Sequence, residues 1–296
     1  MALKKITNSV QQFLLSNDES DKLLKIIKKR YPNGRDPWGL NLDKSRPAIR
    51  VAGGLYKNYF KTKVFGKENV ENRNYIVVAN HSGQIPFDGM ILSCAFLLDV
   101  KYPRILRTMV ERFVTTIPFF SSFVSQNGGV LGDRSNCSEL LKRGESVLVF
   151  PEGARGIAKN TGQFYQLQHF TRGFYRLAIK SKVPILPVSV VGAEEFYPLV
   201  HNFKSIAKVF KVPAFPLTPL FPFVGFLGAI PLPSPVDVHI GEPIEPPEHL
   251  NELSSDEEID EQVDLIKLKI DDLLKQGLKT RRPFWGQKIA NKFSKS

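Results

Sequence analysis

Apolar residues follow two patterns along this chain: short continuous runs and longer stretches with helical spacing. Continuous runs are typical of strands that are buried on both faces of a sheet. They predict five strands, over residues 75–79, 105–110, 146–150, 185–191 and 236–240. Helical patterns between them predict helices over 88–98, 111–125 (interrupted near Pro118) and 170–182. This alternation predicts an α/β fold with a mostly parallel central sheet flanked by helices.

Three further helices are predicted near the N-terminus. Residues 3–14 place apolar side chains at helical spacing beside lysines, and residues 21–30 repeat this pattern with more lysines. A third helix is predicted over residues 48–60. Because the first two helices are amphipathic and basic, we expect them to dock on an anionic membrane surface.

The C-terminal region is predicted to begin with a helix and to end in a basic tail. Ser255 and Glu258 have the spacing of a capping box, which predicts a helix that starts at this point. Gly277 is predicted to end the helix. The tail over 279–296 combines basic and aromatic residues, and both a solvated tail and a membrane contact remain open.

These elements divide the chain into an N-terminal amphipathic helical segment (1–47), a central α/β domain (48–250) and a C-terminal helix with its tail (251–296). Residues 212–236 are unusual because they contain seven prolines and no charged residue. Proline at this density argues against a membrane-spanning helix. A loop that covers the core and a loop that contacts the bilayer interface both remain open.

The composition is that of a folded, basic protein. The 296 residues include 41 Lys and Arg against 29 Asp and Glu, which leaves a formal net charge of +12. A positive field favours anionic partners such as acidic lipid headgroups, phosphorylated substrates or nucleic acid. The two cysteines form neither a disulfide framework nor a Cys-x-x-Cys pair, so a reducing compartment is expected. Neither a secretory signal peptide nor a spanning apolar run is predicted.

The first candidate site follows the predicted strand 75–79. His81 stands at the carboxyl end of that strand, an edge where ligands bind in open α/β sheets. Pro86 suits the first position of the next helix, so Asp88 falls in the first helical turn. A carboxylate on one imidazole nitrogen fixes the tautomer and leaves the other nitrogen as a base. In the alternative interpretation, His81 caps the strand end and Asp88 complements the helix dipole.

The second candidate motif is a glycine-rich turn that ends in Asp133 and Arg134. Ser135 is predicted to cap the helix that follows. An arginine at this position suits phosphate recognition. In the alternative interpretation, Arg134 is an ordinary surface residue of a turn.

The third candidate motif follows the predicted strand 146–150. Glu152 can bind an acceptor hydroxyl, Gly153 allows a ligand to approach the backbone, and Arg155 can meet a phosphate. An ordinary strand-to-loop turn is the alternative. A fourth motif, over 183–195, is chiefly a buried strand, although its stem can also line an acyl channel.

In this order, the four motifs resemble those of the glycerolipid acyltransferase superfamily, typified by 1-acylglycerol-3-phosphate acyltransferases. The resemblance covers residues 74–243. Two motifs are similar to those of the monoacylglycerol-acyltransferase-like subgroup: Asn-His-Ser-Gly-Gln-x-Pro-x-Asp and Val-Val-Gly-Ala-Glu-Glu. The sequence departs from the family pattern at two points. Six residues separate His81 from Asp88 where the family has four, and Ala154 replaces the usual Thr or Ser.

The resemblance implies a role for each candidate residue. His81 would be the general base, and Asp88 the carboxylate that orients it. Acceptor binding would fall to four residues, with the arginine of the second motif near the acceptor phosphate or headgroup: Arg134, Glu152, Gly153 and Arg155.

We therefore expect an O-acyltransferase of phospholipid or other lipid metabolism. Its donor would be acyl-CoA or acyl-carrier protein, and its acceptor a hydroxyl of a lysophospholipid or another glycerolipid-like molecule. We expect no metal and no cofactor besides this co-substrate. The expected partners are an anionic membrane surface, the lipid acceptor and the acyl donor, but no nucleic acid. The expected location is the cytoplasmic face of a membrane, as a peripheral or monotopic protein.

Two other functions explain part of the sequence. A lipid or thioester hydrolase needs a nucleophile, for which Ser82 is the candidate, but the Gly-x-Ser-x-Gly elbow is absent. A non-enzymatic membrane-binding protein on the same scaffold explains the charge and the apolar segment. It does not explain why the acid, base and arginine candidates occur together.

Overall fold

The structure is a computed structural model, and it describes residues 2–82, 87–116, 119–157, 159, 161–197, 201–202, 216–217 and 230–282. Four features of the sequence therefore fall wholly or mostly outside the described residues. These are the predicted helix start at Pro86, the interruption at Pro118, the proline-rich segment 212–236 and the tail beyond residue 282.

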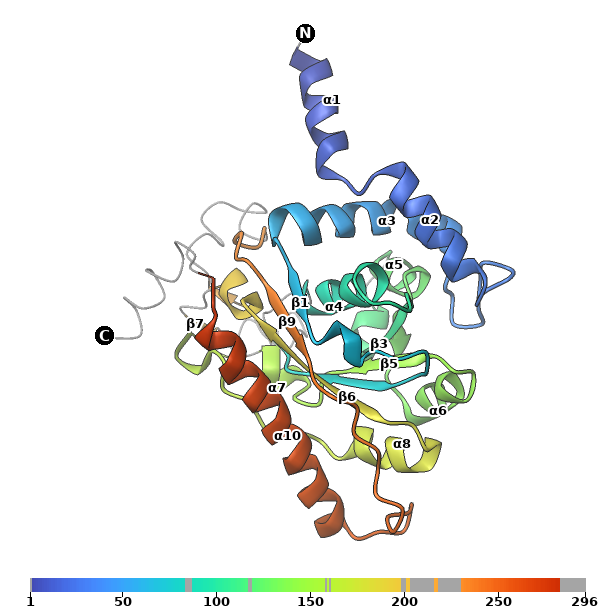
Figure 1. Cartoon of the computed structure of the whole chain (residues 1–296), viewed down its shortest axis with the longest axis vertical. Coiled ribbons are helices and arrows are strands. Elements are labelled where there is room, and N and C mark those ends of the chain that lie inside the picture. The colour runs from blue at the N-terminus through green and yellow to red at the C-terminus, as the bar shows by residue number, and fades with distance from the viewer. Residues whose placement is uncertain are drawn as a thin grey trace.

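In the described residues, seven strands form one sheet in the order β1-β9-β6-β2-β5-β3-β4 (Figure 1). Their bounds are β1 Lys63–Phe65, β2 Ile76–Ala79, β3 Leu106–Val110, β4 Val130–Leu131, β5 Ser146–Val149, β6 Ile185–Val191 and β9 Asp237–Ile240. All neighbours pair in parallel except β6 and β9, which are antiparallel. The predicted α/β class and the mostly parallel sheet are therefore confirmed. A separate two-stranded pair joins β7 (His201–Asn202) to β8 (Pro216–Leu217).

Helices cover both faces of this sheet, and the longest closes one of them (Figure 1). The α-helices are α1 Ala2–Phe13, α2 Asn17–Lys28, α3 Leu42–Gly54, α4 Phe87–Leu98, α5 Phe120–Gln126, α6 Arg134–Lys142, α7 Ala154–Ile157, α8 Gly173–Ser181 and α10 Asp256–Lys279. Shorter helical elements are the π-helix η1 Leu55–Tyr59 and the 3₁₀ helices η2 Lys67–Asn69, η3 Arg112–Thr116, η4 Thr161–Gln163 and η5 Ala193–Phe196. Among the described helices, none has the length and apolarity that crossing a bilayer requires.

The two faces of the sheet bury separate cores because side chains alternate along each strand. On β2, Val77 and Ala79 pack into the core that contains α4, whereas Ile76 and Val78 pack into the core on the opposite face. That second core includes the apolar stripe of α10, which buries five residues: Ile259, Val263, Ile266, Ile270 and Leu274. The predicted division at residue 250 therefore separates two parts that share one core.

The start of α3 and the end of α10 differ from the predictions. The third helix begins at Leu42 rather than at residue 48, because the side chain of Asn41 caps it by accepting the Lys44 N–H at 3.1 Å. The predicted division at 47/48 thus falls inside α3. The capping box at Ser255 is confirmed. The prediction that Gly277 ends α10 is wrong, since the helix continues to Lys279. A Cβ at Gly277 would lie 2.7 Å from side-chain atoms on the sheet, so this glycine permits close helix–sheet packing.

Candidate active site

The predicted site lies where three neighbouring parallel strands end. In register, Val78 of β2 pairs with Val149 of β5, and Ala79 of β2 pairs with Val188 of β6. The residues that follow each strand therefore meet at one edge of the sheet, which is the edge where ligands bind in this class of fold.

A histidine and an aspartate meet at this edge. His81 Nδ1 lies 2.6 Å from Asp88 Oδ2, and the Asp88 side chain is fully buried in the first turn of α4. The same carboxylate accepts the N–H groups of Ser82 and Gly89, each at 2.8 Å. The predicted pairing of His81 with Asp88 is thus present in spite of the six-residue spacing. Because Nδ1 is occupied, Nε2 is the nitrogen left for chemistry.

Packing fixes the imidazole ring and the strand end before it. The Phe150 ring stacks on the His81 ring at 4.2 Å with an interplanar angle of 17°. The buried amide of Asn80 accepts the Val190 N–H at 2.8 Å and donates to the Val190 carbonyl at 3.1 Å, so it extends the pairing of β2 with β6. Gly156 packs against the histidine so closely that a Cβ there would lie 2.6 Å from His81 Cβ.

Glu152 has different partners from those expected of an acceptor-binding residue. Its side chain is buried, and Oε1 accepts the main-chain N–H of His81 at 2.8 Å. The other oxygen, Oε2, accepts the N–H of Gln168 at 2.8 Å and lies 3.0 Å from Lys159 Nζ. Both carboxylate oxygens are therefore engaged by the protein, and Glu152 holds the main chain of the histidine.

Two charged residues of the site were missed by the sequence analysis. Lys159 is 5% exposed and lies between Glu152 and Glu194, which stands three residues after the end of β6. Burial raises the pKa of Glu194 to about 7, and Lys159 opposes this shift. The pKa of Lys159 is itself raised, because the two carboxylates outweigh the lowering effect of burial. The signal in the sequence was the pair Glu194-Glu195, which follows a buried strand after Gly192 and Ala193.

The remaining three predicted site residues are Gly153, Arg155 and Arg134. Gly153 adopts a positive φ of 56°, and Arg155 is exposed on α7, directly before the glycine that packs on His81. Arg134 is exposed at the start of α6, after the edge strand β4. Strands β5 and β3 lie between β4 and β2, which puts roughly 14 Å between their ends at a strand spacing of about 4.8 Å. Within the described part of the chain, neither arginine has an ion-pair partner. The predicted roles of these residues in acceptor binding stay predictions.

The cap of α6 is Asp133, not Ser135 as predicted. Its side chain accepts the Asn136 N–H at 2.8 Å, so the helix begins two residues earlier and Arg134 occupies its first position. Ser82, the candidate nucleophile of a hydrolase, is buried, and its Oγ lies 3.5 Å from Asp88 Oδ2. This environment gives the hydroxyl a carboxylate neighbour but, among the described residues, no hydrogen bond to His81 Nε2.

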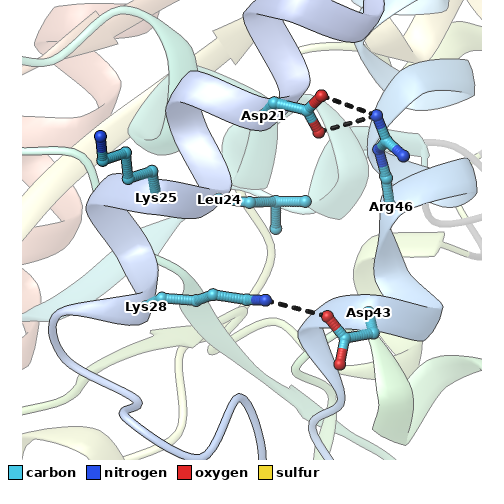
Figure 2. Close-up of a pocket in the computed structure, with 6 residues that line it drawn as sticks. All are labelled: Asp21, Leu24, Lys25, Lys28, Asp43 and Arg46. Carbon is cyan, nitrogen blue, oxygen red and sulfur yellow. Dashed lines mark hydrogen bonds and ion pairs between the residues drawn. The ribbon is translucent and has the colours of Figure 1, made fainter.

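A pocket lies between α2 and α3, away from the carboxyl edge of the sheet (Figure 2). Four of its five charged lining residues pair with one another: Arg46 with Asp21 at 2.7 Å and Lys28 with Asp43 at 3.0 Å. None of the six predicted site residues lines it. Exposed pairs of this kind contribute about 0–1 kcal/mol each, so they tie the two helices together only weakly.

The class of protein to which this sheet and its histidine–aspartate pair belong follows from comparison with known proteins. Residues 61–191 match the family model described as Acyltransferase. This span contains His81, Asp88, Arg134, Glu152, Gly153 and Arg155. This match supports the resemblance of the chain to the glycerolipid acyltransferase superfamily.

Relatives come from distant organisms. An uncharacterised protein of Mycobacterium leprae (strain TN) is 38% identical over 201 residues, which are 67% of this chain and 54% of that protein. The 1-acyl-sn-glycerol-3-phosphate acyltransferase of Saccharomyces cerevisiae is 29% identical over 139 residues, 43% of this chain and 42% of the yeast protein. The chain thus spans about half the length of the curated relatives that it matches.

A solved structure has the same fold. The crystal structure of the 1-acyl-sn-glycerophosphate (LPA) acyltransferase PlsC from Thermotoga maritima matches with a TM-score of 0.51 at 22% identity. The match covers 82% of this chain and 84% of the Thermotoga chain. The likeness therefore extends beyond the family-model span.

Proposed function

We propose that this protein is an O-acyltransferase that moves a fatty acyl group from a thioester donor to a hydroxyl of a glycerolipid-like acceptor. The donor is acyl-CoA or acyl-carrier protein, and no metal or further cofactor takes part. The observation that carries the proposal is the 2.6 Å contact between His81 Nδ1 and Asp88 Oδ2, which leaves Nε2 available at the ligand-binding edge of the sheet.

In the proposed reaction, His81 Nε2 takes the proton of the acceptor hydroxyl while the hydroxyl oxygen attacks the thioester carbonyl carbon. The carbon–sulfur bond then breaks, and the departing thiolate takes the proton from the imidazolium. The products are an ester and a free thiol. The Asp88 carboxylate favours the imidazolium that forms in between, and it keeps the ring in the productive tautomer.

The acceptor is proposed to be a lysophospholipid, with a neutral monoacylglycerol as the other candidate. Arg155 and Arg134 are exposed and have no ion-pair partner among the described residues, which supports an anionic headgroup. Arginine binds phosphate through two parallel hydrogen bonds. Ala154 stands where the family has a hydroxyl residue, which supports an acceptor other than the usual glycerol phosphate.

We also propose that the protein works at the cytoplasmic face of a membrane, bound to anionic lipid. Helix α1 projects from the rest of the fold (Figure 1), and its sequence has apolar residues at helical spacing beside two lysines. Three phenylalanines at the start of α5 add exposed aromatic surface, and one of them is 93% exposed: Phe119, Phe120 and Phe123. Sedimentation with phosphatidylglycerol vesicles, but not with phosphatidylcholine vesicles, is expected. Equal recovery with both would contradict an electrostatic contribution.

The reaction is tested by incubating the purified protein with palmitoyl-CoA and a panel of acceptors, with products identified by mass spectrometry. The panel contains lysophosphatidic acid, other lysophospholipids and monoacylglycerol. General-base catalysis is worth about 10²–10⁴ in rate, so His81→Ala should lower kcat by at least that lower factor. Unchanged turnover by His81→Ala would contradict the mechanism. Thiol release without an acylated product would instead indicate a thioester hydrolase.

A further inference from the structure

Lys159 is a buried cation that the proposed reaction does not use. It follows the short helix α7, and its side chain reaches to the ends of three strands. Its Nζ lies 3.0 Å from Glu152 Oε2, 3.1 Å from Glu194 Oε1 and 3.2 Å from the main-chain oxygen of His81. An ammonium group has three N–H donors, so each of these acceptors takes one.

These contacts close a ring around the peptide backbone of His81. The His81 N–H donates to Glu152 Oε1, the other oxygen of the same carboxylate accepts from Lys159, and Lys159 donates to the His81 carbonyl. Both polar groups of the His81 main chain are thereby held by one ion pair. The ring nitrogen Nδ1 is held separately by Asp88. Main chain and side chain of the base are thus fixed by different groups.

The environment of Lys159 does not suit a proton-transfer role for this residue. Its Nζ is surrounded by two carboxylates, which raise the pKa of the ammonium against the opposing effect of burial. A cation that is held charged and has no donor to spare keeps its partners in place. Burial of such a group is costly unless every donor is paired, as is the case for this lysine.

We propose that Lys159 is a positioning residue that, together with Glu152, clamps the main chain of His81 and so sets the direction of Nε2. This inference rests on the proposed function, because it assigns Lys159 a task in the same reaction. Misplacing a reacting group by about 1 Å can cost about 10² in rate, which is the effect that loss of the clamp should have.

The test compares Lys159→Met with Glu194→Gln in the acyl-transfer assay on the full chain. Lys159→Met keeps the length of the side chain but removes both the charge and the donor to the His81 carbonyl. We expect kcat to fall about 10²-fold while the KM for the thioester changes little. Glu194→Gln removes one buried ion pair but leaves both clamp contacts, so we expect kcat to fall less than about threefold.

A double variant separates positioning from folding. Lys159→Met leaves Glu194 as an unpaired buried carboxylate, which Lys159→Met/Glu194→Gln removes. We expect the double variant to regain melting temperature relative to Lys159→Met but to keep the low kcat. Recovery of kcat in parallel with the melting temperature would overturn the proposal, as would a Lys159→Met kcat within about threefold of the parent. If the parent protein itself transfers no acyl group to any acceptor, the proposed function fails instead.

Discussion

The histidine centre and the two arginines differ in how firmly the protein holds them. His81 is contacted on its ring by Asp88 and Phe150, and its main chain is bonded by Glu152 and Lys159. The arginines at 134 and 155 are exposed and, among the described residues, have no ion-pair partner. The ring and main chain of His81 already have partners within the protein, whereas the two arginines keep N–H donors available for a ligand.

This difference corresponds to two chemical tasks. A general base must be in place before the substrate arrives, because reorganising it during the reaction costs rate. A residue that recognises a headgroup must instead keep its donors available for the ligand. Changes in the first region should therefore lower kcat, whereas changes in the second should raise KM.

The largest effect is expected for Asp88→Asn. The amide is nearly the same size, but it has no charge to favour the imidazolium and does not enforce the tautomer. We expect kcat to fall about 10²–10⁴-fold with an unchanged thioester KM, measured as initial rates of thiol release. A kcat within about threefold of the parent would show that the buried carboxylate only caps α4.

The next effect concerns the pH dependence of folding stability. Burial raises the pKa of Glu194 from 4.5 to about 7, so the folded state holds this proton more tightly than the unfolded state. Its contribution to stability is therefore fully present below pH 4.5 and is lost as the pH rises through about 7. Relative to the parent, Glu194→Gln should gain up to about 3 kcal/mol in free energy of unfolding between about pH 4.5 and 8.

Urea unfolding at several pH values measures this difference. Glu139→Gln is the matched control, because Glu139 forms a half-exposed pair with Arg143 on the surface of α6. The control should show no pH-dependent gain. A Glu194→Gln curve parallel to that of the parent would mean that Lys159 compensates the buried carboxylate fully.

A smaller effect is expected for Gly156→Ala, which adds one methyl group beside the base. The new Cβ would lie 2.6 Å from His81 Cβ, so one of the two must move. We expect kcat to fall about 10²-fold, with a stability loss of about 1–3 kcal/mol. Gly173→Ala is the control, because a methyl group added at Gly173 would meet no neighbouring atom within 4 Å. Equal kcat values for the two variants would show that His81 tolerates displacement.

The fold and the dyad could be predicted because their signals are local in sequence. Continuous apolar runs marked five strands, and His81 and Asp88 flank the turn between one of them and its helix. The edge strands β1 and β4 were missed because they are three and two residues long, too short to show a pattern. The first turns of α3 were missed because they are polar and contain Pro47, which the helix accommodates in its interior.

The clamp could not be predicted because it depends on contacts between distant parts of the chain. Lys159 stands in a polar loop, where a lysine is normally solvated, and it becomes buried only when the ends of β2, β5 and β6 meet. Likewise, Glu152 has the position of a ligand-binding residue in the motif. Only the packing reveals that its two oxygens already accept from His81, Gln168 and Lys159.

The smallest effects on the reaction are expected for substitutions of the two exposed arginines, Arg155 and Arg134. If the acceptor carries a phosphate, Arg155→Ala should raise the KM for lysophosphatidic acid about tenfold with nearly constant kcat, because a hydrogen bond to a charged group is worth about 1.5–3 kcal/mol. Arg134→Ala should raise it less, about threefold, because two strands separate β4 from β2.

Monoacylglycerol serves as the control acceptor for both arginine variants, because it has no phosphate for them to bind. Its KM should not change in either variant. A KM that rises equally for the neutral and the anionic acceptor would mean that the arginines shape the site without recognising charge. An unchanged KM for lysophosphatidic acid would place the headgroup elsewhere and would favour a neutral acceptor. In that case the two arginines would not belong to the same active site as His81.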